Sequence, residues 1–328
     1  MKRIDRESPR VSIMLPCYNC EEYVEEAVRS IINQTYQKLE ILCTDDCSKD
    51  NTYEILERIA RTDSRIILQR HKENRGIVDT LNEMIELASG EYIGRMDADD
   101  ISMPNRIEKQ VAFLINNPEI DICGTQARII DETGRVFSRT ILPETEEEHR
   151  AFLPYFSTVS HPTVLARREF YKQNYYDKEF LHAEDYEMWL RAVFAEKRKI
   201  CNIPELLLDY RVNSKSVSSN NSEVQRRMSA TAVQKYCNDM VEDMEAHLEL
   251  FFLKNYQMDY RIIQKEMDVA RESVLDQDME LQASFYERLV WYCYKCSMPF
   301  KLMRLISTKP GFRAIRRILQ RKINMRRL

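Results

Sequence analysis

The sequence is poor in glycine and proline, with only 6 Gly and 10 Pro in 328 residues. This scarcity argues against long low-complexity linkers. Neither GxGxxG nor GxxxxGKS/T occurs, which disfavours a dinucleotide oxidoreductase and a P-loop NTPase. From the length we expect one large domain, or one domain with an extension.

Long apolar runs are also missing. No apolar segment follows the first three residues, and the most apolar patches, such as 289–294, are far too short to span a bilayer. We therefore expect a protein that is made and kept in the cytoplasm.

Cysteine is present, but it does not form a disulfide framework. The 9 cysteines are an odd number in a chain with no secretory signal, so we expect reduced thiols. Two CxxC pairs, Cys17/Cys20 and Cys293/Cys296, raise the alternatives of zinc and of a redox pair. Zinc is disfavoured because no second pair or histidine lies at a suitable spacing. A redox role for Cys17, in a strand-to-helix turn, is also disfavoured.

Charge is unevenly distributed along the chain. The formal net charge is −4, yet 11 Lys/Arg and no Asp/Glu follow Tyr294. A basic terminus on an acidic body predicts an anionic partner. In 310–328 the apolar residues fall roughly on one helical face with Arg and Lys around the rest, as in a helix lying on an anionic membrane surface. Packing on the domain and nucleic-acid binding are the alternatives. Nucleic-acid binding is disfavoured because no stacking platform of aromatic side chains is interleaved with the basic residues.

The first hundred residues alternate between apolar strands and amphipathic helices. Strands are predicted over 11–15, 39–43, 65–69 and 92–96, and helices over 21–33, from 50 or 51 to 60, and from 76 to 90. Later elements are a helix over 106–116, a strand over 120–123, a hairpin over 127–141 turning at 131–134, and a strand over 206–212. Repeated strand and helix units predict an open, mostly parallel α/β sheet flanked by helices.

Candidate ligand-binding residues follow the predicted strands, at the point where each strand ends. They are Pro16, Tyr18 and Asn19 after the first strand, Asp45 and Asp46 after the second, Asn74 and Arg75 after the third, and Asp97 and Asp99 after the fourth. In open α/β sheets, ligands bind beyond the carboxyl ends of the strands. The sequence therefore predicts one ligand site at this edge.

The stretch 91–104, EYIGRMDADDISMP, carries the clearest chemistry. Its apolar strand ends in Asp97, Asp99 and Asp100, three carboxylates that repel one another. A hard divalent cation, held with help from a phosphate, would neutralise them. The alternative is a solvated acidic turn that caps the helix after Pro104. The stretch alone favours neither.

A second acidic pair, Glu184 and Asp185, comes before an amphipathic helix. A carboxylate at a helix N-terminus stays ionised and can accept a proton. Simple N-terminal capping is the alternative.

Beyond 223 the sequence predicts helices that carry no set of catalytic residues. We divide it into a leader 1–10, a catalytic domain 11–220, a helical extension 221–309 and a basic amphipathic helix 310–328.

Five motifs in order resemble the family 2 glycosyltransferases of the GT-A fold, which use nucleotide sugars. They are VSIMLPCYNCEEYVEEAVRSIINQTY, EILCTDDCSKDNT, NRGIVDTLNEMIELASGEYIGRMDADD, SHPTVLARREF and HAEDYEMWL. The resemblance covers roughly 10–220. Relatives often carry YR-x-H-x-x-S near its end, where this chain has Asn213 in place of the histidine. A carbonyl oxygen still suits a hard cation.

The resemblance implies a site for a nucleotide-sugar donor, most simply a UDP-sugar. Pro16 and Tyr18, with Asn19 in the same turn, would line the base, and Asp45 or Asp46 would bind uracil or ribose. Arg75 and Asn82 lie in the segment that closes over the nucleotide. In the DxD motif, Asp97 would face the ribose with Ala98 beside it.

The resemblance also implies the catalytic groups. Asp99 would ligate Mn²⁺ or Mg²⁺, Asp185 would be the general base, and Glu184 would orient acceptor or sugar. His161 and His182 are weaker candidates for acceptor contacts. A single base opposite a metal-held leaving group implies in-line displacement and an inverted product.

The leading hypothesis is a metal-dependent inverting glycosyltransferase of surface polysaccharide synthesis. We expect it on the inner face of the cell membrane, acting on a glycan or polyprenyl-linked acceptor, with no nucleic-acid partner. A nucleotidyltransferase would need a glycine-rich basic loop after the first strand, which is absent. A silent scaffold recruited to membrane is the other alternative. Donor sugar, linkage and homo-oligomerisation stay open.

Overall fold

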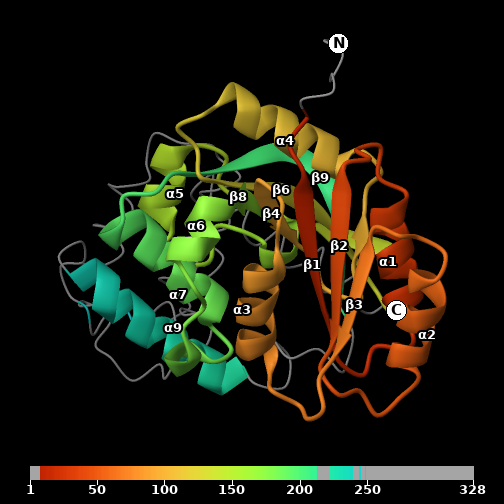
Figure 1. The fold of residues 1–328 in the computed structure, drawn as a ribbon. Coiled ribbons are helices and arrows are strands. Elements are labelled where there is room, and N and C mark those ends of the chain that lie inside the picture. The colour runs from red at the N-terminus through yellow and green to blue at the C-terminus, as the bar shows by residue number, and fades with distance from the viewer. Residues whose placement is uncertain (1–7, 213–221, 239–243, 245–247, 249–328) are drawn as a thin grey trace.

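The computed structural model describes residues 8–212, 222–238, 244 and 248 (Figure 1). Asn213, the basic helix 310–328 and most of the helical extension lie outside the described residues. The predictions made for them therefore remain sequence predictions.

The first half of the sheet is parallel and follows the predicted order. Its strands are β1 (Val11–Cys17), β2 (Leu39–Asp45), β3 (Ile66–Arg70) and β4 (Tyr92–Arg95), arranged β3-β2-β1-β4. They are joined by α1 (Val24–Ile32), α2 (Thr52–Ala60) and α3 (Ile77–Leu87). Every residue of β1 and β2 is buried, as expected for apolar central strands with helices on both faces.

The second half of the sheet is mixed. The order continues β8 (Leu165–Arg167), β6 (Ile122–Ile130), β9 (Ile200–Arg211) and β5 (Ile101–Ser102), and β7 (Val136–Arg139) pairs with β6. Only β6 and β9 pair in parallel here; the other ladders are antiparallel. The predicted α/β class is confirmed, although this half is less parallel than expected. The predicted hairpin accounts for one antiparallel pair, because so short a turn can join only antiparallel strands.

Two layers of helices cover the sheet. Side chains alternate across β1, so Met14 belongs to one core while Ile13 and Leu15 belong to the other. The first core is completed by α3, α6 (Arg168–Gln173), α7 (Glu184–Leu190) and α9 (Ser222–Cys237), and the second by α1, α2 and α4 (Arg106–Asn116). The other helices in the described part of the chain are α5 (Glu146–Phe152), η1 (His161–Thr163), η2 (Lys178–Phe180) and η3 (Arg191–Ala195).

Proline does not end the strands where the sequence suggested. β1 continues through Pro16 because its pairing with β4 stops at Met14, so the missing N–H of Pro16 faces no partner strand. β9 begins well before Pro204. Its pairing with β6 skips from Ile203 to Leu206, so Pro204 lies in a bulge that needs no ladder hydrogen bond.

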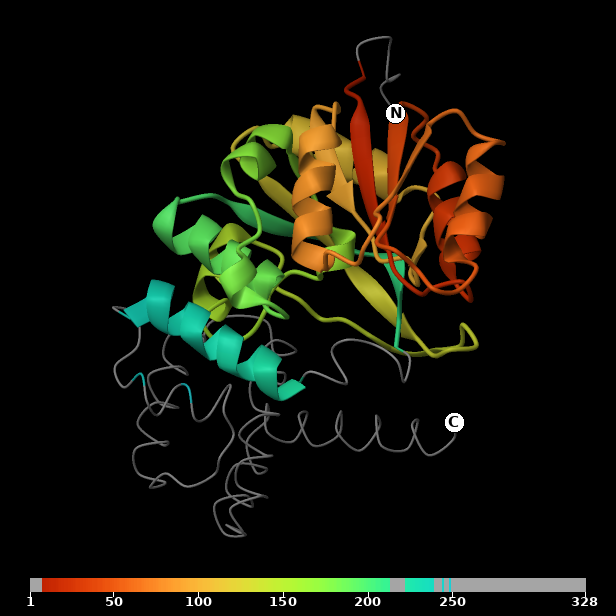
Figure 2. The ribbon, with the colours of Figure 1, turned by 60° about the horizontal axis from the view of Figure 1, so that its bottom comes forward.

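Helix α9 packs along α7 and the neighbouring helices (Figure 2). Its buried residues include Val233 and Cys237, which join the same core as Trp189 of α7. The hydroxyl of Tyr236 donates to the buried Glu187 carboxylate at 2.6 Å. Among the described helices, none has the length and apolar character needed to cross a membrane.

The packing of α9 can be tested by placing a charge on each of its faces. Val233 is fully buried, so Val233→Asp should lower the free energy of unfolding by about 3 kcal/mol or more in urea titrations. Gln234→Asp adds the same charge at an exposed position and should change it by less than about 0.5 kcal/mol. Equal effects of the two variants would contradict the docking of α9.

Candidate active site

The turn after β1 and the loop after β2 are tied together at the carboxyl edge of the sheet. Asn19 is in the left-handed region with φ 48°. Its N–H donates to Oγ of Ser48 at 2.9 Å, and its Oδ1 accepts from the N–H of Lys49 at 2.8 Å. Tyr18, the preceding residue, is 49% exposed. These hydrogen bonds hold the turn in place, and the ring of Tyr18 beside it is half exposed.

Asp46 organises the loop after β3. Its Oδ1 accepts from the N–H of Arg75 at 2.8 Å and lies 2.7 Å from Nδ1 of His71. Its Oδ2 accepts from the N–H of Gly76 at 2.8 Å. The side chain of Arg75 pairs with Glu83 and is otherwise well exposed. Asp46 therefore fixes the start of α3 and places the Arg75 side chain at the rim.

Asp45 is buried more deeply than Asp46. It is 0% exposed, against 5% for Asp46, and one of its oxygens lies 3.3 Å from Nε of Arg70. Its Oδ1 has no hydrogen-bond partner in the described part of the chain. Both carboxylates are therefore buried, Asp45 more completely than Asp46.

Three carboxylates converge beyond β4. Carboxylate oxygens of Asp97, Asp99 and Asp100 lie within 4.8 Å of one another. The buried guanidinium of Arg95 pairs with both oxygens of Asp97, one of them at 2.7 Å. Burial, reinforced by the charge of Asp97, raises the pKa of Asp99 to about 6. This cluster keeps more negative charge than one arginine can balance.

Asp100 is the structural member of the cluster. It is fully buried, and its Oδ1 accepts from the N–H of Arg211 at 2.9 Å. Nε of Arg211 donates to the carbonyl of Asp99 at 2.8 Å, which closes the acidic loop against β9. Burial, with Asp97 and Asp99, raises the pKa of Asp100 well above its usual range. Its Oδ2 is buried with no hydrogen-bond partner among the residues described.

The predicted acidic pair lies at the start of α7. Glu184 and Asp185 are its first two residues, and the N–H of Tyr186 donates to Oδ1 of Asp185 at 2.8 Å. Burial raises the pKa of Asp185; Arg95 opposes this rise and the charge of Asp97 adds to it. Burial and the charge of Asp185 raise the pKa of Glu184 to about 7. Asp185 therefore lies within electrostatic range of both Arg95 and Asp97.

The other predicted residues have different surroundings. The buried His161 lies 2.8 Å from the Tyr176 hydroxyl through Nε2 and 4.0 Å from Asp185 through Nδ1. Asn82 uses both ends of its amide on the backbone of Tyr176, at 2.9 and 3.0 Å, which joins α3 to the loop that carries Tyr176. His182 sits just before α7 with φ 71°, a strained backbone conformation for a residue with a side chain.

Three residues, Arg95, Arg211 and Tyr176, were not predicted from the sequence. A signal existed for Arg95, because residues two apart on a strand lie on the same side and Arg95 precedes Asp97 by two. A signal existed for Arg211 as well, since it belongs to the YR pair two residues before Asn213. Tyr176 carried no local signal, since its partner His161 comes from a distant segment.

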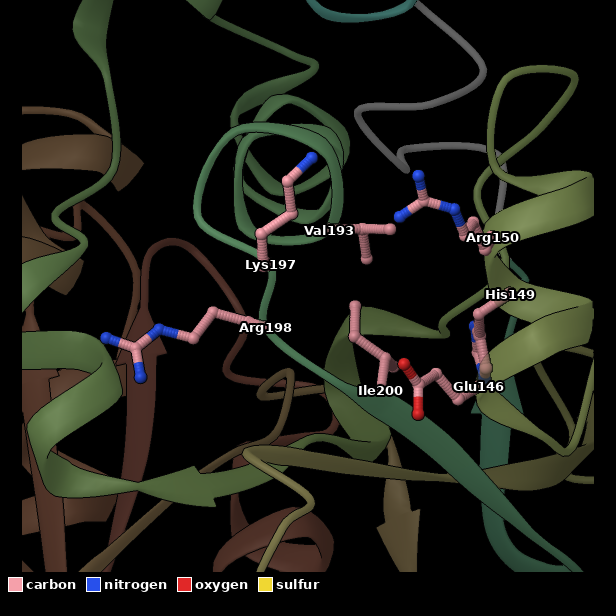
Figure 3. Close-up of a pocket in the computed structure, with 7 residues that line it drawn as sticks. All are labelled: Glu146, His149, Arg150, Val193, Lys197, Arg198 and Ile200. Atoms are coloured by element: carbon pink, nitrogen blue, oxygen red, sulfur yellow. The ribbon is translucent and has the colours of Figure 1, made fainter. Parts of the chain in front are cut away.

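A separate hollow lies between α5, η3 and the start of β9 (Figure 3). It is lined by Glu146, His149, Arg150, Val193, Lys197, Arg198 and Ile200. Ile200 is the first residue of β9, whereas Arg211 at the other end of the strand contacts the acidic loop. The hollow is therefore not the candidate active site.

Comparison with known proteins decides the family. The model of Glycosyl transferase family 2 matches residues 12–174. An uncharacterized glycosyltransferase of Haemophilus influenzae is 31% identical over 268 residues, which cover 76% of this chain and 81% of that protein. The chain belongs to glycosyl transferase family 2. It is accordingly a glycosyltransferase, and the match includes the acidic loop after β4.

Two further comparisons concern a named relative and a solved structure. The Escherichia coli protein WfgD, named UDP-Glc:alpha-D-GlcNAc-diphosphoundecaprenol beta-1,3-glucosyltransferase, is 29% identical over 75% of this chain and 91% of its own. The mannosyltransferase PcManGT of Pyrobaculum calidifontis, solved with GDP-Man and Mn²⁺, superposes with a TM-score of 0.57 at 16% identity. That superposition covers 91% of this chain and 86% of the other, which confirms the predicted fold.

His149, at the hollow, should give the fold a pH dependence. Burial lowers its pKa to about 3, below the unfolded value of about 6.5, so protonation favours unfolding. The stability it contributes is complete above pH 6.5 and lost as the pH falls toward 3. In urea titrations, the wild type should lose about 2 kcal/mol more than His149→Gln between pH 7.5 and 5. Parallel pH profiles would contradict this assignment.

Proposed function

We propose that this enzyme is a metal-dependent, inverting glycosyltransferase that moves a sugar from a UDP-sugar to a glycan or polyprenyl-linked acceptor in surface polysaccharide synthesis. The observation that carries the proposal is the placement of two acid groups, Asp97 to Asp100 and Glu184 with Asp185, around the buried Arg95. The donor and the diphosphoundecaprenol acceptor in the name of the relative WfgD support the choice of substrate classes.

The acidic loop has the donor set that a hard divalent cation requires. Its oxygens lie within 4.8 Å of one another, and burial with the charge of Asp97 raises the pKa of Asp99 to about 6, a cost that a bound cation would relieve. Asp97 is already paired with Arg95, and Asp100 is sealed from solvent. Asp99 would therefore hold Mn²⁺ or Mg²⁺. A bound cation would offset the charge that builds on the leaving diphosphate. Asn213 is retained as a second candidate ligand from sequence.

Asp185 is the proposed general base. Its side chain is 26% exposed, so an acceptor hydroxyl can reach it, and burial of the remainder makes the carboxylate a stronger base. The acceptor oxygen bonds to the anomeric carbon, its proton passes to Asp185, and the bond from that carbon to the diphosphate breaks. Attack opposite the leaving group inverts the configuration. Glu184 would orient the acceptor or sugar.

The nucleoside is assigned to the edge beside β1 and β2. Tyr18 offers an exposed ring for the base, with Pro16 and Asn19 in the same braced turn. Asp46, rather than the sealed Asp45, would accept from uracil or ribose. Arg75 would close over the nucleotide. Asp97, with Ala98 beside it, would face the ribose.

Two other functions have distinct signatures. A nucleotidyltransferase would release diphosphate from a nucleoside triphosphate and a sugar phosphate. A silent scaffold would bind nucleotide without any transfer. Release of free UDP from a UDP-sugar, dependent on an acceptor, is expected only from the glycosyltransferase.

Asp99→Asn should abolish the metal dependence of nucleotide binding. Wild-type protein is expected to show a rise in melting temperature with UDP that is larger in Mn²⁺ than in EDTA, because the cation links Asp99 to the diphosphate. The variant should show the same small rise in both. Glu205→Gln, an acid removed from the distant bulge of β9, should behave as wild type. A metal effect that survives in Asp99→Asn would overturn the ligand assignment.

Asp185→Asn should lower kcat by about 10²- to 10⁴-fold, because it removes proton transfer while keeping the shape of the side chain. UDP binding, read by thermal shift, should remain as in wild type. The measurement is acceptor-dependent release of UDP across a panel of UDP-sugars. Full activity of this variant would exclude Asp185 as the base.

The basic segment 310–328 is proposed to bring the enzyme to an anionic membrane surface. Deleting these residues should reduce binding to liposomes that contain anionic lipid and leave UDP binding unchanged. Sedimentation with anionic and neutral liposomes measures the difference. If the deletion variant binds anionic liposomes as well as the wild type does, segment 310–328 has no membrane role.

A further inference from the structure

We propose that His161 and Tyr176 form a positioning pair that holds the Asp185 carboxylate toward the acceptor hydroxyl. The inference rests on the proposed function, because it takes Asp185 as the base. It assigns His161 to orienting that base in place of the acceptor contact expected from sequence.

The two oxygens of Asp185 have different surroundings. Oδ1 accepts from the N–H of Tyr186 at 2.8 Å, so the start of α7 fixes that side of the carboxylate. Oδ2 faces Nδ1 of His161 at 4.0 Å. A small rotation of the Asp185 side chain would bring this pair within hydrogen-bond distance. The remaining lone pair of Oδ2 is then directed to the acceptor.

The imidazole is held by packing on both sides. His161 is 8% exposed, and its ring lies 5.5 Å from the ring of Tyr176 and 6.0 Å from that of Trp189, centroid to centroid. Its backbone belongs to η1, where its carbonyl accepts from the N–H of Val164 at 3.2 Å. With so little exposed surface, His161 is poorly placed to bind an acceptor sugar directly.

The hydrogen bond to Tyr176 selects the tautomer. Nε2 of His161 lies 2.8 Å from the Tyr176 hydroxyl. Burial raises the pKa of Tyr176 well above its usual range, so the phenol keeps its proton and is able to donate it to Nε2. Burial, reinforced by Arg95, lowers the pKa of His161 well below its usual range, so the ring is neutral and carries a single hydrogen. We take Tyr176 as the donor of this pair, which assigns the ring hydrogen to Nδ1, facing the carboxylate.

Tyr176 is itself held from two directions. Both ends of the Asn82 amide bond to its backbone, which joins it to α3. Arg191 donates to the carbonyl of Tyr175 at 2.9 Å and to Asn174 at 2.8 Å, which joins the same loop to the end of α7. The hydroxyl is thus presented to His161 from a loop with little freedom. During transfer the acceptor proton goes to Asp185, and His161 keeps its own.

Two substitutions at His161 separate positioning from packing. The amide nitrogen of asparagine can replace Nδ1, whereas that of glutamine replaces Nε2. His161→Asn should keep a donor toward Asp185 and retain more kcat than His161→Gln, which keeps only the side toward Tyr176. We expect His161→Gln to lose about 10- to 100-fold in kcat, with the KM for the UDP-sugar unchanged. If His161→Gln is as active as His161→Asn, or if the loss is in donor KM, the proposal is wrong.

Tyr176→Phe removes one oxygen and tests the tautomer with little risk to folding. It should lower kcat severalfold at unchanged donor KM. The matched control is Tyr236→Phe, which removes a hydroxyl bonded to Glu187 of the same helix α7 but has no contact with His161 among the described residues. Equal losses in the two variants would indicate a general effect on α7 and overturn the proposal.

The outcome can be distinguished from failure of the proposed function. If Asp185→Asn keeps full activity, Asp185 is not the base, and the function itself must be revised. If Asp185→Asn is inactive while His161→Gln and Tyr176→Phe match wild type, the base stands and only the positioning pair fails. Thermal unfolding and UDP binding of each variant show that the fold and donor site are intact.

Discussion

The structure of the site depends on one buried cation placed between two groups of carboxylates. Burial works against the charge on Arg95, but Asp97 outweighs it, so the pKa of Arg95 is raised and the guanidinium is charged. The same charge opposes the rise in pKa of Asp99 and of Asp185. Without Arg95, the repulsion between Asp97, which follows β4, and Asp185 of α7 would not be offset. Removing one partner of such a buried pair typically costs about 3–5 kcal/mol.

Two arginines hold the acidic loop from different sides. Arg95 pairs with both oxygens of Asp97. The backbone N–H of Arg211 donates to Oδ1 of Asp100, and its Nε donates to the carbonyl of Asp99. Burial and the charge of Asp97 raise the pKa of Asp99 to about 6, while Arg95 and Arg211 oppose that rise. A cation bound as proposed above would favour the ionised form of these carboxylates.

The sequence predicted the fold well wherever the pattern was local. Apolar strands, amphipathic helices and the hairpin turn at 131–134 were identified, and the predicted helix 106–116 coincides with α4. Pro16 lies inside β1 and Pro204 inside β9, outside the bounds predicted for these strands. Whether the missing N–H of a proline matters depends on the neighbouring strand, which the local sequence does not reveal. The antiparallel pairing of β8 with β4 and β6 has no signature in the short segment that forms it.

The candidate site was predictable to the extent that its residues follow strand ends or begin a helix. Asp97, Asp99 and Asp185 have such positions, and their convergence follows from the carboxyl-edge rule. The contacts of His161 and Asn82 with Tyr176 join segments far apart in sequence, so no spacing could reveal them. Asp45 and Asp46 looked equivalent as neighbours, but the fold buries Asp45 completely and joins Asp46 to the backbone of Arg75 and Gly76.

The bond between Tyr236 and Glu187 makes α9 a partner of α7, the helix that carries the proposed base. Glu187 lies two residues after Asp185, is fully buried, and is balanced by Arg191 and by the Tyr236 hydroxyl from α9. Shortening the protein ahead of α9 would remove that donor and uncover the apolar side of α7. We therefore expect a fragment that keeps α7 in its native packing to extend through Cys237, well beyond the segment that carries the family motifs.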